Sequence, residues 1–76
     1  MIVNKDVKPN RKIYYLGALV IEILGKKESP EVGYLDLYFE LCEVEQVSID
    51  VFSLTLDWLF ILGILDINHG KIKKCF

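Results

Sequence analysis

The apolar residues in the first third of the chain follow a helical period. They recur at intervals of three and four positions, at Ile13, Leu16, Val20 and Leu24. This spacing places them on one face of an α-helix, and the Gly25 that follows is typical of a helix end. The pattern predicts a helix over residues 11–24, capped by Asn10. The polar residues 1–10 are expected to form an N-terminal arm.

A second helix is predicted from a local start signal. Ser29 offers a hydroxyl that can cap a helix, Pro30 suits the first helical position, and Glu31 adds a negative charge at the positive end of the helix dipole. We therefore expect a helix over residues 30–43. Its apolar positions include Leu35, Tyr38, Phe39 and Cys42.

A third helix is expected over residues 48–62, with Ser48 as its cap and Gly63 as its stop. This helix is apolar on two sides. The side expected to face the core carries Phe52, Leu56, Leu59 and Phe60. The other side carries Val51, Leu54, Trp58, Ile61 and Leu62. Because one side is enough to pack on the first two helices, the other needs a different cover.

Beyond Gly63 the pattern changes to the period of a strand. Apolar and polar residues alternate from Leu65 to Asn68, and the sequence Asn68-His69-Gly70 is typical of a tight turn. The flanking residues are therefore expected to pair as a two-stranded hairpin. Three helices followed by a hairpin predict a mainly α fold with a C-terminal β-hairpin, a winged-helix-like domain over residues 11–76.

The composition indicates contact with a partner through exposed apolar side chains. Of the 76 residues 53% are hydrophobic, and a chain of this length buries only about 60% of the surface that its unfolded form exposes. The interface candidates are Trp58, Leu54, Val51, Ile61 and Leu62 on the third helix and Tyr14, Tyr15, Ala18 and Ile21 on the first. Trp58 is the foremost, because large aromatic side chains dominate interfaces, although it could equally fill the core. A homodimer could use these surfaces as well as a complex with another protein.

Residues that could carry catalysis, a cofactor or a metal ion are few and scattered. Cys42 and Cys75 form no CxxC pair, and the single histidine, His69, lies in the predicted turn without further ligands. The cysteines are interpreted as reduced thiols of a cytoplasmic protein, with a disulfide as the alternative. The most apolar run, residues 58–65, is far shorter than the ~20 residues that span a bilayer. We expect no enzymatic activity, no cofactor and no membrane insertion.

The charges argue against sequence-specific DNA binding, which a winged-helix layout would otherwise suggest. Residues 28–70 contain no Lys or Arg but nine acidic residues. The third helix, which would enter the major groove, carries Asp50 and Asp57 and no Arg, Lys, Asn or Gln to read bases. Candidate phosphate contacts are the hairpin lysines Lys71, Lys73 and Lys74, which could instead keep an edge strand soluble.

The chain resembles a known family. The segment SIDVFSLTLDWLFILGILDINHGKIKKCF, with LDWLFILGILDI at its centre and NHGKI at its turn, is similar to the small middle components of prokaryotic ABC-three-component systems, most of all to middle component 6. The helix sequence IYYLGALVIEIL fits the same family. The resemblance extends from about residue 11 onward and is weaker over residues 25–47.

The resemblance implies a subunit encoded between an SMC-like ABC ATPase and an effector. Such systems, which include Lamassu-type loci, are implicated in defence against phages and plasmids. The leading hypothesis is therefore a non-catalytic adaptor that bridges the ATPase and the effector through its apolar helix surfaces. The alternative hypothesis is a small winged-helix DNA-binding regulator whose affinity for a duplex depends on the hairpin lysines.

Overall fold

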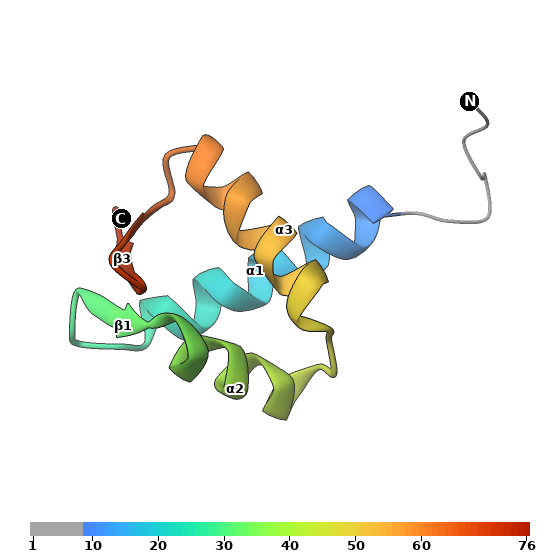
Figure 1. The fold of residues 1–76 in the computed structure, drawn as a ribbon, viewed down its shortest axis with the longest axis horizontal. Helices are drawn as coiled ribbons and strands as arrows, with labels where there is room; N and C mark the ends of the chain where they lie inside the picture. Colours follow the sequence, from blue (N-terminus) through green and yellow to red (C-terminus); the bar gives the residue numbers. More distant parts are fainter. Residues whose placement is uncertain (1–8) are drawn as a thin grey trace.

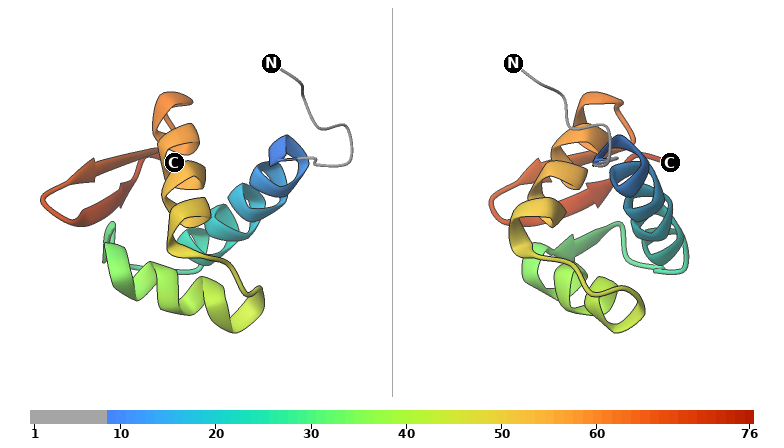
Figure 2. Two further views of the ribbon diagram at one scale, coloured as in Figure 1. Left: turned by 45° about the vertical axis from the view of Figure 1, so that its right-hand side comes forward. Right: turned by 90° about the vertical axis from the view of Figure 1, so that its right-hand side faces the viewer.

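Three helices and a small antiparallel sheet make up the fold. The computed structural model describes residues 9–76. In chain order its elements are α1 Pro9–Gly25, β1 Glu31–Gly33, α2 Tyr34–Val44, α3 Ile49–Ile61, β2 Leu65–Asn68 and β3 Lys71–Lys74 (Figure 1). The hairpin of β2 and β3 projects at one end, and the start of α1 lies at the opposite end (Figure 2). The predicted fold class, a mainly α winged-helix-like domain with a C-terminal hairpin, is confirmed.

Helix α1 forms along the predicted apolar stripe but begins earlier than expected. The stripe is buried at Leu16, Val20 and Leu24. The helix starts at Pro9, so that Asn10, expected to be the cap, is itself helical. Proline lacks only an N–H that is unused at the first helical position, and Pro9 therefore starts the helix without losing a hydrogen bond. Residues 1–8 of the predicted arm lie outside the described residues.

The predicted start of the second helix is wrong, because this segment forms the strand β1. The strand pairs antiparallel with β3 and places Val32 opposite Ile72. Both side chains are buried in the core, and this long-range pairing overrides the local helix signal at Ser29. The Ser29 hydroxyl instead accepts a hydrogen bond from the backbone N–H two residues later, at 3.3 Å. Helix α2 begins at Tyr34.

Helix α3 has the predicted cap and the predicted stop. The Ser48 hydroxyl accepts a hydrogen bond from the Val51 N–H at 3.3 Å, which caps the first turn. After the helix, Gly63 adopts a φ of 80°. The N–H groups of Gly63 and of the residue after it donate to the carbonyls of Phe60 and Leu59, each at 3.0 Å. This is a Schellman motif, in which glycine supplies the left-handed conformation that ends the helix.

The sheet has three strands in the order β1-β3-β2, so the predicted hairpin of β2 and β3 is confirmed and gains a third strand. His69 and Gly70 form the two-residue turn with φ values of 53° and 74°, as a type I′ turn requires. On β3, Ile72 is buried against the helices, and Lys71 and Lys73 lie on the exposed face. The third strand, β1, pairs with β3 and comes from a segment that the sequence pattern had assigned to a helix.

One backbone donor on the outer edge of β2 is satisfied by a side chain. The Cys75 N–H donates to Ile64 O at 3.0 Å, and the antiparallel alternation then turns the Ile67 N–H away from β3. The Asp66 carboxylate accepts a hydrogen bond from this N–H at 2.9 Å. A side chain of the edge strand therefore occupies one of the backbone donors on the outer edge of that strand.

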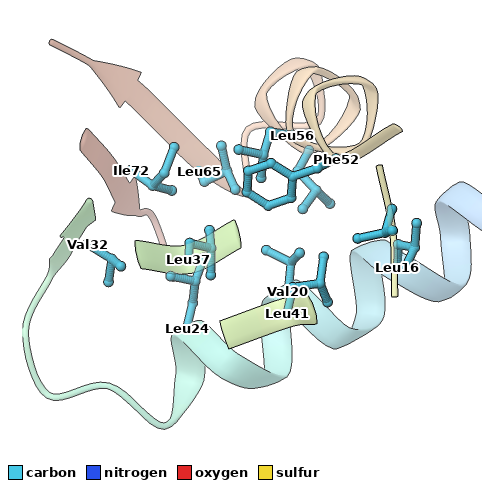
Figure 3. Close-up of a cluster of buried hydrophobic side chains, with 12 residues drawn as sticks. Leu16, Val20, Leu24, Val32, Leu37, Leu41, Phe52, Leu56, Leu65 and Ile72 are labelled. Atoms are coloured by element: carbon cyan, nitrogen blue, oxygen red, sulfur yellow. The ribbon is translucent and has the colours of Figure 1, made fainter. Parts of the chain in front are cut away.

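The core lies where the helices meet the sheet (Figure 3). Its buried apolar residues are Leu16, Val20, Leu24, Val32, Leu37, Leu41, Val47, Phe52, Leu56, Leu59, Leu65 and Ile72. The Phe52 ring packs against the rings of Tyr34 and Tyr38, each with its centroid 5.1 Å away. Full burial of one such side chain contributes about 1.5–3 kcal/mol. The buried Thr55 donates its hydroxyl to Val51 O at 2.9 Å, which satisfies a polar group inside the core.

Candidate interaction surface

Many large apolar side chains lie on the surface of the described chain. They are Tyr14, Tyr15, Leu35, Phe39, Val44, Ile49, Leu54, Phe60, Ile61, Leu62 and Phe76. Single exposed apolar residues are ordinary, but contiguous groups of them mark contact surfaces. None of the described helices has both the length and the apolar composition needed to cross a bilayer.

Trp58 of α3 lies across the surface of α1. Its ring packs over Gly17, where an added Cβ would come within 2.9 Å of the Trp58 Cζ3 atom. The ring also contacts that of Tyr14, with the two centroids 4.8 Å apart. Trp58 is half-buried. The indole therefore packs α3 onto α1 and leaves part of its surface accessible.

The other interface candidates on α3 differ in exposure. Leu54, Ile61 and Leu62 are exposed, and Ile61 is the most exposed of them at 78%. Val51 is half-buried and packs against the core. These residues follow or precede Trp58 by three, four or seven positions, and residues three and four apart are neighbours on a helix surface.

Phe60, which the apolar pattern assigns to the core, is 49% exposed. The residues of α3 that are buried are Phe52, Thr55, Leu56 and Leu59. The core face is therefore rotated toward Thr55, which a pattern of apolar residues cannot include, and away from Phe60. The polar Thr55 side chain can be buried there because its hydroxyl donates a hydrogen bond to a backbone carbonyl.

The candidates on α1 are only partly brought together. Tyr14, Tyr15 and Ala18 are exposed, whereas Ile21 is half-buried and packs against the core. Tyr14 contacts Trp58, but Tyr15 lies one position further and thus about 100° around the helix. We refer to Tyr14, Leu54, Trp58, Ile61 and Leu62 as the Trp58 surface.

A second apolar surface lies on α2, at positions that the apolar pattern did not assign to the exterior. Leu35 and Phe39 are exposed and four positions apart, so they are neighbours on the helix. Helix α2 instead buries Leu37 and Leu41. The two pairs have the same spacing, and periodicity alone therefore did not decide which pair faces the core. We refer to Leu35 and Phe39 as the α2 pair.

Acidic residues of α3 are free of ion pairs in the described part of the chain. The ion pairs there are Lys12–Glu45 at 3.1 Å, Lys26–Glu22 at 3.6 Å and Lys27–Glu40. All three have solvent-accessible side chains and contribute little to stability. Asp50 and Asp57 are exposed and belong to none of the three pairs.

The three lysines of β3 do not form one basic patch. Lys71 and Lys73 are exposed on the same face of the sheet. Lys74 lies on the other face, where its Nζ donates to Leu24 O at 3.0 Å and to Lys27 O at 2.6 Å. A cation at the C-terminal end of a helix pairs with carbonyls that lack a helical partner and interacts favourably with the helix dipole. The structure thus places two of the three candidate phosphate contacts, Lys71 and Lys73, in solvent.

Two features of the described residues bear on metal binding and catalysis. No group of three or more His, Cys, Asp or Glu side chains among them is arranged to hold a metal ion. An open groove of roughly 560 Å³ is lined by Lys27, Ser29, Glu31, Val32, Gly33, Asp36, Phe39, Glu40 and Lys71. Its charges are mixed, and Lys27 is paired with Glu40. No nucleophile with an adjacent base lines the groove.

The phenol of Tyr38 holds the connection between α2 and α3. Its hydroxyl donates to Val47 O at 2.8 Å, and the Cys42 Sγ lies 3.7 Å from the same oxygen. The hydrogen bond with Cys42, and to a lesser degree burial, raise the pKa of Tyr38 above its ordinary value of 10.0. The group stays protonated at neutral pH and serves the fold.

Comparison with known proteins gives a match at the level of the family. The model of the ABC-three component (ABC-3C) system Middle Component 6 family matches residues 2–75. No curated protein and no solved structure matches the chain.

Proposed function

Because the chain belongs to the ABC-three component (ABC-3C) system Middle Component 6 family, we propose that it is a non-catalytic adaptor of a defence system. In this proposal it works in the cytoplasm and bridges an SMC-like ABC ATPase and an effector, in a system of the Lamassu type directed against phages or plasmids. A middle component is one of several components of its system, so its partners are the other components.

The observation that carries this proposal is the presence of two apolar surfaces on different helices. The Trp58 surface extends over α1 and α3, whereas the α2 pair lies on a third helix, α2, and the three helices are seen in Figure 2. A bridging subunit needs two separate contacts, whereas a subunit with one partner needs one. Burial of a large apolar side chain against a partner contributes about 1.5–3 kcal/mol before the entropic cost of association.

Within the Trp58 surface we assign the central contact to Trp58. Its ring is already positioned by Gly17 and Tyr14, so a partner that binds it has little side-chain entropy left to remove. Ile61 and Leu62 extend the surface toward the end of α3. On α2, Phe39 is the larger member of the α2 pair, and we assign to it the part that Trp58 plays on α3.

Co-purification tests the proposal. The chain carries a tag and is expressed with the ATPase and the effector encoded beside it, and we expect the tag to retrieve both in one complex. Replacing Leu54 and Ile61 together by Ser should release one component. Replacing Leu35 and Phe39 together by Ser should release the other. All four side chains are exposed, so the fold should be retained, which circular dichroism checks.

Val44→Ser is the matched control. Val44 is also an exposed apolar residue of α2, but it lies outside both surfaces, so this variant should retrieve both components. A wild-type chain that retrieves neither component shows that the proposed function is wrong. If both double variants still retrieve both components, the contacts are made elsewhere on the chain.

A further inference from the structure

Helix α3 presents a regular stripe of acidic and aliphatic side chains to solvent. Asp50, Leu54, Asp57 and Ile61 follow one another at spacings of four, three and four residues, which places them on one face of the helix. All four are exposed, and the opposite face carries the buried Phe52, Leu56 and Leu59. We refer to these four residues as the α3 stripe.

The α3 stripe has negative charges that the described chain does not neutralise. Asp50 and Asp57 take part in none of the ion pairs of the described residues. Residues 28–70, which contain α2, α3 and β2, have no Lys or Arg. A surface that alternates carboxylates with aliphatic side chains is complementary to one that alternates cations with aliphatic side chains.

We infer that the α3 stripe is the docking site of a basic amphipathic helix, supplied by another component of the system. This inference rests on the proposed function and specifies the chemistry of one partner. The spacing of four and three residues is that of helices packed at a shallow crossing angle. The stripe is about 16 Å long at 1.5 Å per residue, which matches three turns of a partner helix. Lys or Arg side chains of that helix face Asp50 and Asp57, and its aliphatic side chains cover Leu54 and Ile61.

The same charges disfavour a symmetric pairing of two α3 helices. In a two-fold interface the same surface meets itself, so the carboxylates of Asp50 and Asp57 from both copies would gather without a cation between them. Like charges brought together in an interface cost several kcal/mol. The carboxylates of Asp50 and Asp57 also repel the phosphates of a DNA duplex, which the third helix of a DNA-binding winged helix would contact. The occupant is therefore a cationic protein segment.

The experiment measures binding of the full chain to the purified ATPase and to the purified effector, over a range of salt concentrations. Asp57→Lys reverses the central charge of the stripe and is expected to weaken binding to one component at least tenfold. Asp57→Asn should cause a smaller loss. Glu43→Lys is the matched control, because it makes the same change of charge at an exposed position on α2; its affinity for the component that Asp57→Lys binds more weakly should stay within twofold of the wild type. The wild-type affinity should fall with salt, and that of Asp57→Lys should fall less steeply.

A photocrosslinking amino acid in place of Ile61 identifies the occupant directly. The expected product joins α3 to a partner peptide that has Lys or Arg at helical spacing. A crosslink to a second copy of this chain, or to a segment without cations, overturns the inference. So does an Asp57→Lys variant that binds as tightly as the wild type, or no more weakly than the Glu43→Lys control. If the wild type binds neither component, the proposed function fails and this inference with it. If it binds but the stripe is insensitive to charge, only this inference fails.

Discussion

The ammonium group of Lys74 donates a hydrogen bond to the backbone carbonyl of Leu24 at 3.0 Å, and so joins β3 to the C-terminal end of α1. A second hydrogen bond, to Lys27 O at 2.6 Å, holds the same group in the turn that follows the helix. In the sequence Lys74 belongs to a group of lysines that suggests contact with phosphate. In the structure its charge serves the fold.

We predict that Lys74→Met destabilises the protein by about 1–3 kcal/mol, because two carbonyls lose a charged donor while the aliphatic stem is preserved. Urea denaturation followed by circular dichroism measures the change. Lys73→Met, at an exposed position on the opposite face of β3, is the control and should stay within about 0.5 kcal/mol of the wild type. Equal stability of the two variants would show that the Lys74 contacts do not stabilise the fold.

Binding of duplex DNA should be undetectable even at low salt. The outer face of α3 carries Asp50 and Asp57, and the two exposed lysines of β3 provide too little positive charge for stable contact with phosphates. Fluorescence anisotropy with a labelled duplex of mixed sequence, at about 50 mM salt, checks this prediction. Salt-sensitive binding that disappears when Lys71, Lys73 and Lys74 are replaced together would support the regulator hypothesis instead.

Gly17→Ala should destabilise the packing of α1 on α3 despite the better helix propensity of alanine. The added Cβ would lie 2.9 Å from the Trp58 Cζ3 atom, and overpacking of this kind costs about 1–3 kcal/mol. The gain in helix propensity offsets about 1 kcal/mol of that cost. Equilibrium unfolding gives the net change, and the fluorescence of Trp58, the single tryptophan, reports whether its ring moves.

The same substitution in a Trp58→Leu background separates the two effects. Without the indole above it, Gly17→Ala should become neutral or stabilising by up to about 1 kcal/mol. Circular dichroism serves as the probe there, because the tryptophan is absent. A destabilisation of the same size in both backgrounds would show that the contact with Trp58 is not the cause.

Gly63→Ala should destabilise the protein by about 1–2 kcal/mol through the backbone alone. Gly63 has a φ of 80°, and no atom lies within 4 Å of the position that a Cβ would take. The cost therefore comes from the left-handed conformation and not from a clash. Gly25→Ala is the control, because its Cβ would meet nothing closer than 3.9 Å and it lies at the end of α1. Thermal unfolding measures the change: Gly63→Ala should have a lower unfolding midpoint than the wild type, and Gly25→Ala an equal or higher one.

Local patterns predicted the elements whose ends are determined within a few residues. Ser48, Gly63 and the turn at Gly70 act through hydrogen bonds and backbone angles of their own neighbourhood, and each was identified. The start signal at Ser29 was just as local, but the pairing of Val32 with Ile72 decided against it. That pairing joins residues 40 positions apart, and local sequence patterns do not show which distant strand will pair with this segment.

The candidate surface was predictable to a similar extent. Two apolar sides on one helix indicate that a surface exists, and Leu54, Ile61 and Leu62 are exposed. Which side faces inward depended on Thr55, a polar residue whose burial is possible because a backbone carbonyl accepts a hydrogen bond from its hydroxyl. The α2 pair could not be distinguished from Leu37 and Leu41 by spacing, since the choice between them follows from where β1 ends and α2 begins.

The hydrogen bond from the Ile67 N–H to the Asp66 carboxylate bears on how molecules of this chain behave when they are crowded together. A strand from a neighbouring molecule pairs with the free N–H groups of an edge strand. On β2 the Ile67 N–H is already bound by the negatively charged Asp66 carboxylate. Growth of the sheet from molecule to molecule, the usual first step toward fibrils, is therefore opposed at β2. Addition of a strand at β2 is thus disfavoured, while the exposed apolar side chains of the helices stay accessible to other contacts.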